Sequence, residues 1–158
     1  MAANSEIELL ITTFAEIVRH YCSWVEGSFS DPHQEMLTVR KLLAELHLGV
    51  LDLPNLGCGD VKDFPALNQK NGTYQRFQNM PIDGYWDVFD PLNEEDTESV
   101  FNSLADDLTD IYRDLKRGLL LYNQGHIVEA IWEWRFLFDI HWGTHLVGAQ
   151  RVIHSYFS

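Results

Sequence analysis

Cysteine is scarce in this sequence, which contains only Cys22 and Cys58. Two cysteines provide neither a disulfide framework nor the ligand spacing of a zinc site, and two reduced thiols are usual in a cytosolic protein. The N-terminal stretch lacks the basic region of a signal peptide, and no apolar run approaches the roughly 18 residues of a membrane span. We therefore expect a soluble cytoplasmic protein that does not enter a membrane.

Lysine and arginine are also few, numbering 11 against 24 aspartates and glutamates, which gives a formal net charge of −13. Nucleic acids and anionic membrane surfaces are bound by clustered positive charge, so we expect neither as a partner. The excess of acid is concentrated between Arg76 and Arg113, where there are ten acidic residues and no lysine or arginine. Such a stretch is typical of a solvated acidic loop and helix face; the alternative is a docking surface for a basic partner or a cation.

The short motifs of several enzyme classes are absent as well. Gly57-Cys58-Gly59 lacks the further glycine and the lysine of a phosphate-binding loop. Neither a Gly-x-Ser-x-Gly nucleophile elbow nor a Glu-x-x-His ligand pair of the di-iron type occurs in the chain. Motifs alone therefore identify no reaction.

The apolar residues that are present repeat with helical spacing. From Gly125 to Phe157 one stripe is apolar or aromatic, and the first half of this segment carries a second apolar face. A helix of this kind must be covered on most sides. We predict an all-α fold, an up-and-down-like four-helix bundle in a single domain of residues 1–158, with helices at about 4–26, 31–50, 95–123 and 126–157.

Residues 51–94 lose this periodicity and contain four of the five prolines. We expect them to form a long, irregular but packed loop between the second and third helices, with short helical turns near 62–68 and 84–89. Their aromatic side chains are then placed to cover the second face of the last helix. The alternative is a loop that roofs a ligand pocket. The pattern leaves open whether Gly143 kinks the last helix or breaks it.

The aromatic content exceeds what the interior of a small bundle normally needs. The candidates for an aromatic pocket or an interface are Trp86, Trp132, Trp134, Phe136 and Trp142. Surplus aromatic surface on helices contacts either the long loop or another subunit. We expect either a homodimer, the commonest assembly of soluble proteins, or an unidentified protein partner.

Three histidines are predicted to project into the bundle. His47 comes from the second helix, whereas His141 and His145 lie four residues apart on one face of the last helix. Imidazoles gathered from facing helices bind divalent metals, and three of them with an open coordination position suit Zn²⁺, Ni²⁺ or Fe²⁺. Inward histidines are more often neutral, hydrogen-bonded core residues, so the leading expectation is that the protein has no cofactor.

Acidic residues lie along the margin of the apolar stripe in the third predicted helix, namely Asp107, Asp110 and Asp114. They could add oxygen ligands to a metal site, and Asp107 or Asp114 could act with an inward histidine in general acid–base catalysis. The more ordinary interpretation is a buried ion pair, for which Arg135 on the inner side of the last helix is the obvious partner.

The second half of the chain resembles a known family. Residues 85–91, Tyr-Trp-Asp-Val-Phe-Asp-Pro, are similar to that family's Tyr-x-x-Val-Phe-Asp-Pro motif. Further matches follow in the same order, at residues 103–111, Asp114-Leu115, Gly118-Leu119, Tyr122, Gly125, Glu129-Ala130, Trp132, Trp134 and Trp142-Gly143. The family is the bacterial domain-of-unknown-function family 5063, a group of small helical proteins. The resemblance, carried by residues 85–158, implies a cytosolic helical bundle in a bacterium, with no catalytic residue and no cofactor.

These patterns together favour a non-catalytic cytoplasmic interaction or accessory module. The alternative is a metal-dependent enzyme with a site made of His47, His141 and His145 in the bundle core. The family motif includes Trp142-Gly143 but no histidine at 141 or 145, which counts against an essential metal site there. The surroundings of the imidazoles distinguish the two: nitrogens bonded to Asp, Arg or backbone indicate a structural role, whereas nitrogens that converge on one point indicate ligands.

Overall fold

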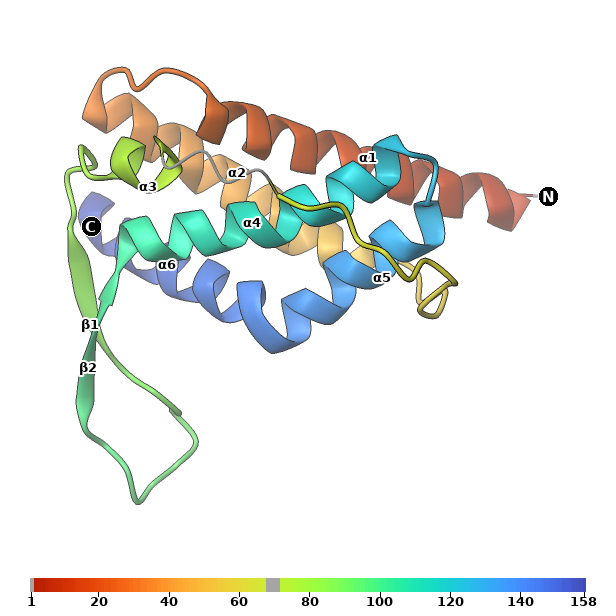
Figure 1. Ribbon diagram of the computed structural model, residues 1–158. Coiled ribbons are helices and arrows are strands. Elements are labelled where there is room, and N and C mark those ends of the chain that lie inside the picture. The colour runs from red at the N-terminus through yellow and green to blue at the C-terminus, as the bar shows by residue number, and fades with distance from the viewer. Residues whose placement is uncertain (1, 68–71) are drawn as a thin grey trace.

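The computed structural model describes residues 2–67 and 72–158, and most of them are helical. The body is formed by α1 (Ala2–Glu26), α2 (Pro32–Asp52), α4 (Leu104–Asn123) and a bent C-terminal rod. This rod consists of α5 (Ile127–Leu137), a π-helical turn η1 (Phe138–Trp142) and α6 (Gly143–Phe157). Between α2 and α4 come a short helix, α3 (Gly72–Phe77), and two strands, β1 (Gly84–Val88) and β2 (Ser99–Ser103), as Figure 1 shows.

Local sequence explains where two of these helices begin and where one ends. The carboxylate of Asp31 accepts the N–H of Gln34 at 3.1 Å and caps α2, which starts where the helix at 31–50 was expected. The Ser103 hydroxyl accepts the N–H of Asp106 at 3.2 Å and caps α4 in the same way. After α4, Gly125 adopts φ = 86°, a left-handed conformation that favours glycine and allows the tight connection to α5.

The expected start of the third long helix at residue 95 is wrong, because residues 99–103 form a strand. β1 and β2 pair antiparallel, from Gly84 opposite Ser103 to Val88 opposite Ser99. Their valines and aromatic residues suit an extended, paired backbone. This two-stranded sheet corrects the all-α expectation, and it also replaces the helical turn expected at 84–89.

The predicted helix 126–157 is present from Ile127 to Phe157, and it is bent and not broken near Gly143. It changes from α-helix to a π-helical turn at Phe138 and returns to α-helix at Gly143, and Figure 1 shows the bend at this place. A Cβ added to Gly143 would overlap the carbonyl oxygen of Phe138. Glycine is therefore needed at the start of α6, where its backbone approaches the first residue of η1.

The apolar core lies between α1, α2, α4 and the rod, and its largest members are tryptophans. Trp134 and Trp142 are both fully buried. The indole N–H of Trp134 donates to the carbonyl oxygen of Leu115 at 3.0 Å, and that of Trp142 to the carbonyl oxygen of Trp134 at 2.9 Å. Both polar groups are thus satisfied inside the core. Within residues 2–67 and 72–158, no helix combines the length and apolar character that crossing a membrane requires.

The outer face of the rod is less covered than expected. Phe136 is 42% and Ile140 60% exposed, and the half-buried Trp132 stacks on Phe136 with 4.7 Å between ring centroids. The hydrogen bonds from residues 53–67 to α5 lie elsewhere: the N–H of Asp60 donates to Glu129 at 3.2 Å, and Arg135 donates to the backbone oxygen of Leu53. The predicted cover of loop aromatics is therefore wrong. The turn expected near 62–68 is not helical at 62–67, and residue 68 lies outside the described residues.

Candidate functional site

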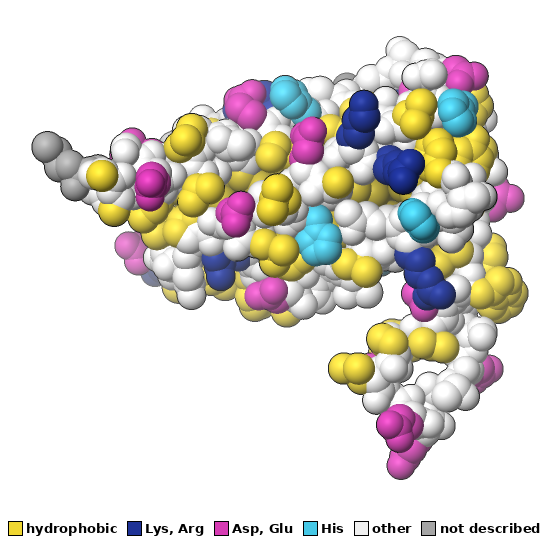
Figure 2. Space-filling model, turned by 180° about the vertical axis from the view of Figure 1, so that it is seen from behind, with side chains coloured by type: hydrophobic (Ala, Val, Ile, Leu, Met, Phe, Trp, Pro, Cys, Tyr) yellow, Lys and Arg dark blue, Asp and Glu magenta, His cyan; other side chains and the backbone are white. Residues whose placement is uncertain are grey.

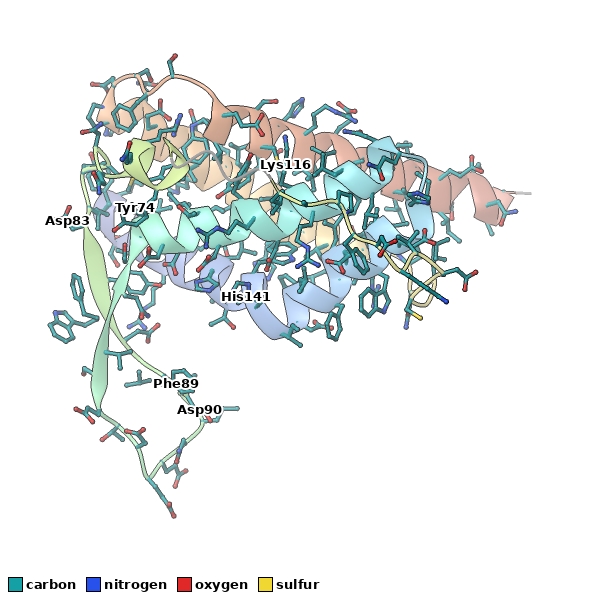
Figure 3. The ribbon with its side chains drawn as sticks, viewed as in Figure 1. Tyr74, Asp83, Phe89, Asp90, Lys116 and His141 are labelled. Atoms are coloured by element: carbon teal, nitrogen blue, oxygen red, sulfur yellow. The ribbon has the colours of Figure 1, made fainter. Side chains whose placement is uncertain are left out.

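Polar side chains from three helical elements gather on one side of the body. α4 contributes Asp107, Asp110 and Asp114, whose spacing of three and four places them on one side of the helix. η1 contributes His141 and α6 contributes His145. We call these five residues the His–Asp cluster; in Figure 3 its member His141 lies on the underside of the body, where α4 faces the rod.

Each histidine of the His–Asp cluster is held by its own aspartate. Nδ1 of His141 lies 2.6 Å from Oδ2 of Asp114, and Nδ1 of His145 lies 2.8 Å from Oδ1 of Asp107. Asp110 comes between these two pairs along α4, and its Oδ2 lies 3.5 Å from Nε2 of His145. The two imidazole rings are 4.8 Å apart between centroids. The structure therefore brings five of the sequence-predicted site residues into one cluster.

The surroundings of these groups shift their proton affinities. The hydrogen bond with Asp107 raises the pKa of His145, and this effect, with the charges of Asp110 and Asp114, outweighs the lowering caused by burial. Burial raises the pKa of Asp114, and the bond with His141 only partly opposes it. His145 and Asp114 therefore each keep a proton to higher pH than they would in water.

Tyr85 joins the His–Asp cluster from β1. Its hydroxyl donates to Oδ2 of Asp107 at 2.7 Å, so both oxygens of that carboxylate have partners. The hydroxyl lies against Gly148 of α6, where an added Cβ would overlap it. Burial and the adjacent Asp107 raise the pKa of Tyr85, so the phenol keeps its proton and remains a donor. Sequence reasoning missed this role, although Tyr85 is the first residue of the motif at 85–91.

A hairpin extends from the body beside the cluster. We call residues 84–103 the hairpin arm; Figures 1 and 2 show it projecting away from the helices. Its base is held by Arg151, which donates to Asp87 at 3.2 Å, and by the N–H of Leu104, which donates to the carbonyl oxygen of Asp83 at 3.2 Å. Large apolar side chains are exposed along the arm: Trp86 by 67%, Phe89 by 88%, Leu92 by 89% and Phe101 by 58%.

His47 is not part of the His–Asp cluster. Its Nδ1 lies 3.1 Å from the Gln150 side-chain oxygen, and its ring packs against Phe138 with 5.9 Å between centroids. Gln150 follows His145 by five residues, which is about 140° around an α-helix. α2 therefore meets α6 on a different side from α4, and the structure does not bring the three predicted histidines together.

Arg135 and the predicted aromatic residues also lie outside the His–Asp cluster. Arg135 donates to the backbone oxygen of Leu53 instead of pairing with an aspartate, whereas Asp110 pairs with Arg113 at 3.0 Å. The aromatic candidates do not form one pocket: Trp134 and Trp142 lie in the core, and Trp86, Trp132 and Phe136 lie at the surface or half-buried.

Glu133 on α5 is a buried acid that sequence reasoning missed. The residue is 3% exposed, and its Oε2 lies 3.6 Å from the Arg117 guanidinium and has no hydrogen-bond partner among the described residues. Burial raises the pKa of Glu133, and the nearby charge of Asp114 acts in the same direction. Glu133 lies between Trp132 and Trp134 in the sequence, and this was the signal that could have identified it as a buried residue.

Within the described residues, the group with metal-ligand character is Asp110, His141 and His145, which each offer a ligand atom within 4.8 Å of the other two. Both Nδ1 atoms bond to aspartate, as expected of structural histidines. Nε2 of His145 nevertheless faces Oδ2 of Asp110 at 3.5 Å, which is a separation that two ligands of one ion can have.

Comparison with known proteins gives a family and a fold. A family model described as "Domain of unknown function (DUF5063)" matches residues 5–158, so the resemblance noted for residues 85–158 extends over essentially the whole chain. The crystal structure of protein BF1032 from Bacteroides fragilis is similar with a TM-score of 0.76 and 18% identity, covering 93% of this chain and 91% of that chain. At this identity the similarity shows the fold alone. No curated protein matches the chain.

Proposed function

This chain belongs to the family Domain of unknown function (DUF5063), and we propose that it acts in the cytoplasm as a non-catalytic interaction module whose hairpin arm binds a partner protein. The observation that carries the proposal is the exposure of Trp86, Phe89, Leu92 and Phe101 on an arm that the body holds in place.

Exposed apolar side chains of this size are a reason to expect a covering surface. Trp86 and Phe101 face each other across the strand pair, with 5.3 Å between ring centroids, and form an aromatic pair on one face of the arm. Phe89 and Leu92 follow in the loop, 88% and 89% exposed. Contiguous apolar groups on a projecting element mark interaction sites, and aromatic residues contribute strongly to binding energy.

The charge of the arm specifies the chemistry of its partner. Residues 84–103 include six acids and no lysine or arginine; the acids are Asp87, Asp90, Glu94, Glu95, Asp96 and Glu98. Figure 2 shows acidic side chains toward the tip of the arm and apolar ones nearer the body. An apolar groove bordered by lysine and arginine complements this pattern. A second copy of the chain brings the same net charge of −13, so charge favours a different, basic protein over a homodimer.

The base of the arm is fixed before any partner arrives. Tyr85 is bonded to Asp107, and Asp87 to Arg151, so the strands leave the body in one direction. Preorganised binding elements lose less conformational freedom on association. The free thiols of Cys22 and Cys58 suit the reducing cytoplasm.

The test compares an arm variant with a matched control. Phe89→Ser/Leu92→Ser removes apolar groups from the arm, and Leu48→Ser/Leu51→Ser removes equivalent groups from α2, where they are 66% and 63% exposed. We expect the wild type and the α2 control to capture the same protein from producing cells, and the arm variant to lose it. With that protein purified, calorimetry should show an approximately 30-fold weaker Kd for the arm variant, about 2 kcal/mol.

Two results would overturn the proposal. Capture and Kd that do not change in the arm variant would remove the arm from binding. Dimers of the purified wild type that dissociate in the arm variant, measured by light scattering, would make a second copy the occupant instead of a basic protein. Salt is a further check, because pairing between the acidic arm and a basic groove must weaken as ionic strength rises.

A further inference from the structure

The Nδ1 atoms of the His–Asp cluster have partners, and this determines which ring atoms are free. Nδ1 of His141 faces Asp114 at 2.6 Å, and Nδ1 of His145 faces Asp107 at 2.8 Å. In a neutral imidazole, an Nδ1–H donated to a carboxylate leaves the lone pair on Nε2. A carboxylate behind the ring is also the arrangement that orients metal-binding histidines and increases their basicity. Asp107 and Asp114 thus prepare two Nε2 atoms to act as ligands.

Asp110 supplies an oxygen between these two histidines. Arg113 occupies its Oδ1 at 3.0 Å, while its Oδ2 lies 3.5 Å from Nε2 of His145. Two ligand atoms that are each about 2.1 Å from a tetrahedral ion lie about 3.4 Å apart, so the observed separation is already that of a metal site. The His141 side chain is 45% exposed, which leaves its ring room to turn toward the same point.

The charge around this point is negative. Asp107, Asp110 and Asp114 lie within two turns of α4, and the described cations against them are Arg113 and Arg117. Asp114 also lies close enough to Glu133 for its charge to raise the pKa of Glu133, and Oε2 of Glu133 has no hydrogen-bond donor among the described residues. A divalent cation would offset this excess. His141 itself lies in η1, and single π-helical turns occur frequently at functional sites.

We propose that Asp110, His141 and His145 bind one divalent transition-metal ion, Zn²⁺ or Fe²⁺ in class, with Asp107 and Asp114 as positioning residues. Two imidazole nitrogens and one carboxylate oxygen suit these ions, whereas Ca²⁺ and Mg²⁺ prefer oxygen alone. Three protein ligands leave a coordination position open for water or a small ligand, on the solvent side at His141. Asp110 is therefore the third ligand, a role that the sequence pattern assigned to His47.

Metal titration of the full-length protein tests this site. After treatment with EDTA, calorimetry with Zn²⁺ should show one ion per chain, and Co²⁺ should give the visible absorption of a low-coordinate nitrogen–oxygen site. Asp110→Asn and His145→Gln should each weaken Zn²⁺ binding at least 100-fold. Asp107→Asn, a change behind the ligand, should weaken it about 10–100-fold. The matched controls Asp106→Asn, exposed on the same helix, and His47→Gln should bind like the wild type.

Circular dichroism and the unfolding midpoint of the metal-free variants verify that each one is folded. Absence of saturable 1:1 binding, or wild-type affinity in Asp110→Asn, would overturn the proposal. A weak, octahedral, oxygen-type Co²⁺ spectrum of the wild type would overturn it independently of any variant. The arm variant Phe89→Ser/Leu92→Ser should bind Zn²⁺ normally, so failure of the metal site and failure of the proposed arm interaction remain distinguishable.

Discussion

Glu35 is a buried carboxylate that joins three parts of the helical body, and Glu35→Gln tests how strongly it holds them. The residue is 4% exposed. It accepts hydrogen bonds from the Trp24 indole at 2.5 Å, from the Ser30 N–H and hydroxyl at 2.8 and 3.0 Å, and from Arg76 at 3.2 Å. α1, the connection to α2, and α3 therefore all donate to this one group.

The substitution keeps the size of the side chain but removes its charge and one of its acceptor oxygens. Removing one partner of a buried ion pair costs about 3–5 kcal/mol, because the other charge stays buried and unpaired. The Arg76 side chain is only 8% exposed, so this cost applies here. Lost hydrogen bonds to a charged acceptor, about 1.5–3 kcal/mol each, overlap with this figure. We expect the free energy of unfolding at pH 7 to fall by about 3–5 kcal/mol.

The same contribution must depend on pH in a defined direction. Burial alone would raise the pKa of Glu35, but the bonds from Ser30 and Trp24, together with Arg76, outweigh it and lower the pKa. An acid with a lower pKa in the folded state contributes its full stability above its unfolded pKa of about 4.3. That stability is lost as pH falls through the folded pKa. The difference between wild type and Glu35→Gln should therefore be largest at neutral pH and shrink below about pH 4.

Urea unfolding followed by tryptophan fluorescence at pH 7 and pH 3.5 measures both effects. The control is Glu16→Gln, an acid on α1 whose side chain is 58% exposed, which should change stability by no more than about 0.5 kcal/mol. A loss below about 1 kcal/mol at pH 7 in Glu35→Gln would refute the ion-pair argument, given the cost expected for breaking a buried pair. A difference that stays constant down to pH 3.5 would refute the pKa argument.

Three further substitutions test other parts of the structure. Gly118→Ala should destabilise by about 1–3 kcal/mol in urea unfolding, although alanine favours helix, because its Cβ would overlap the buried Trp134 ring; a gain would contradict this packing. Because burial raises the pKa of Glu133, the wild type should lose stability as pH rises above about 4.3, so Glu133→Gln should have the higher Tm at pH 7 and a similar Tm at pH 4. A lower Tm at pH 7 would mean that the carboxylate is well paired. Gly148→Ala should displace the Tyr85 hydroxyl and reduce hydrogen-exchange protection in β1 and β2; unchanged protection would show that this contact does not hold the arm.

The start of α2 was predictable because one local feature decides it, whereas the hairpin arm was not. Asp31 caps α2 with its own side chain, within four residues of sequence. The strand at 99–103 depends on pairing with residues 84–88. The spacing of apolar residues within one segment carries no information about such pairing. Val100, Phe101 and Leu104 also fit a helical stripe, but Phe101 is 58% exposed and belongs to no core face. A helical stripe that continued through an exposed aromatic residue therefore led to the wrong element.

The His–Asp cluster depends on a relation between helices that no single-helix pattern contains. Spacing alone predicted that His141 and His145 share a face, and that the three aspartates line one side of α4. From Asp107 to Asp114 is about 10 Å along a helix, whereas from His141 to His145 is about 6 Å. When the two elements pack, the outer aspartates therefore reach beyond the histidines and engage Nδ1, and Asp110 falls between them, facing Nε2 of His145. A shift of one helical turn in this packing would pair Asp110 with an Nδ1 atom and leave no carboxylate between the rings, so the proposed metal site depends on the register of α4 against η1 and α6.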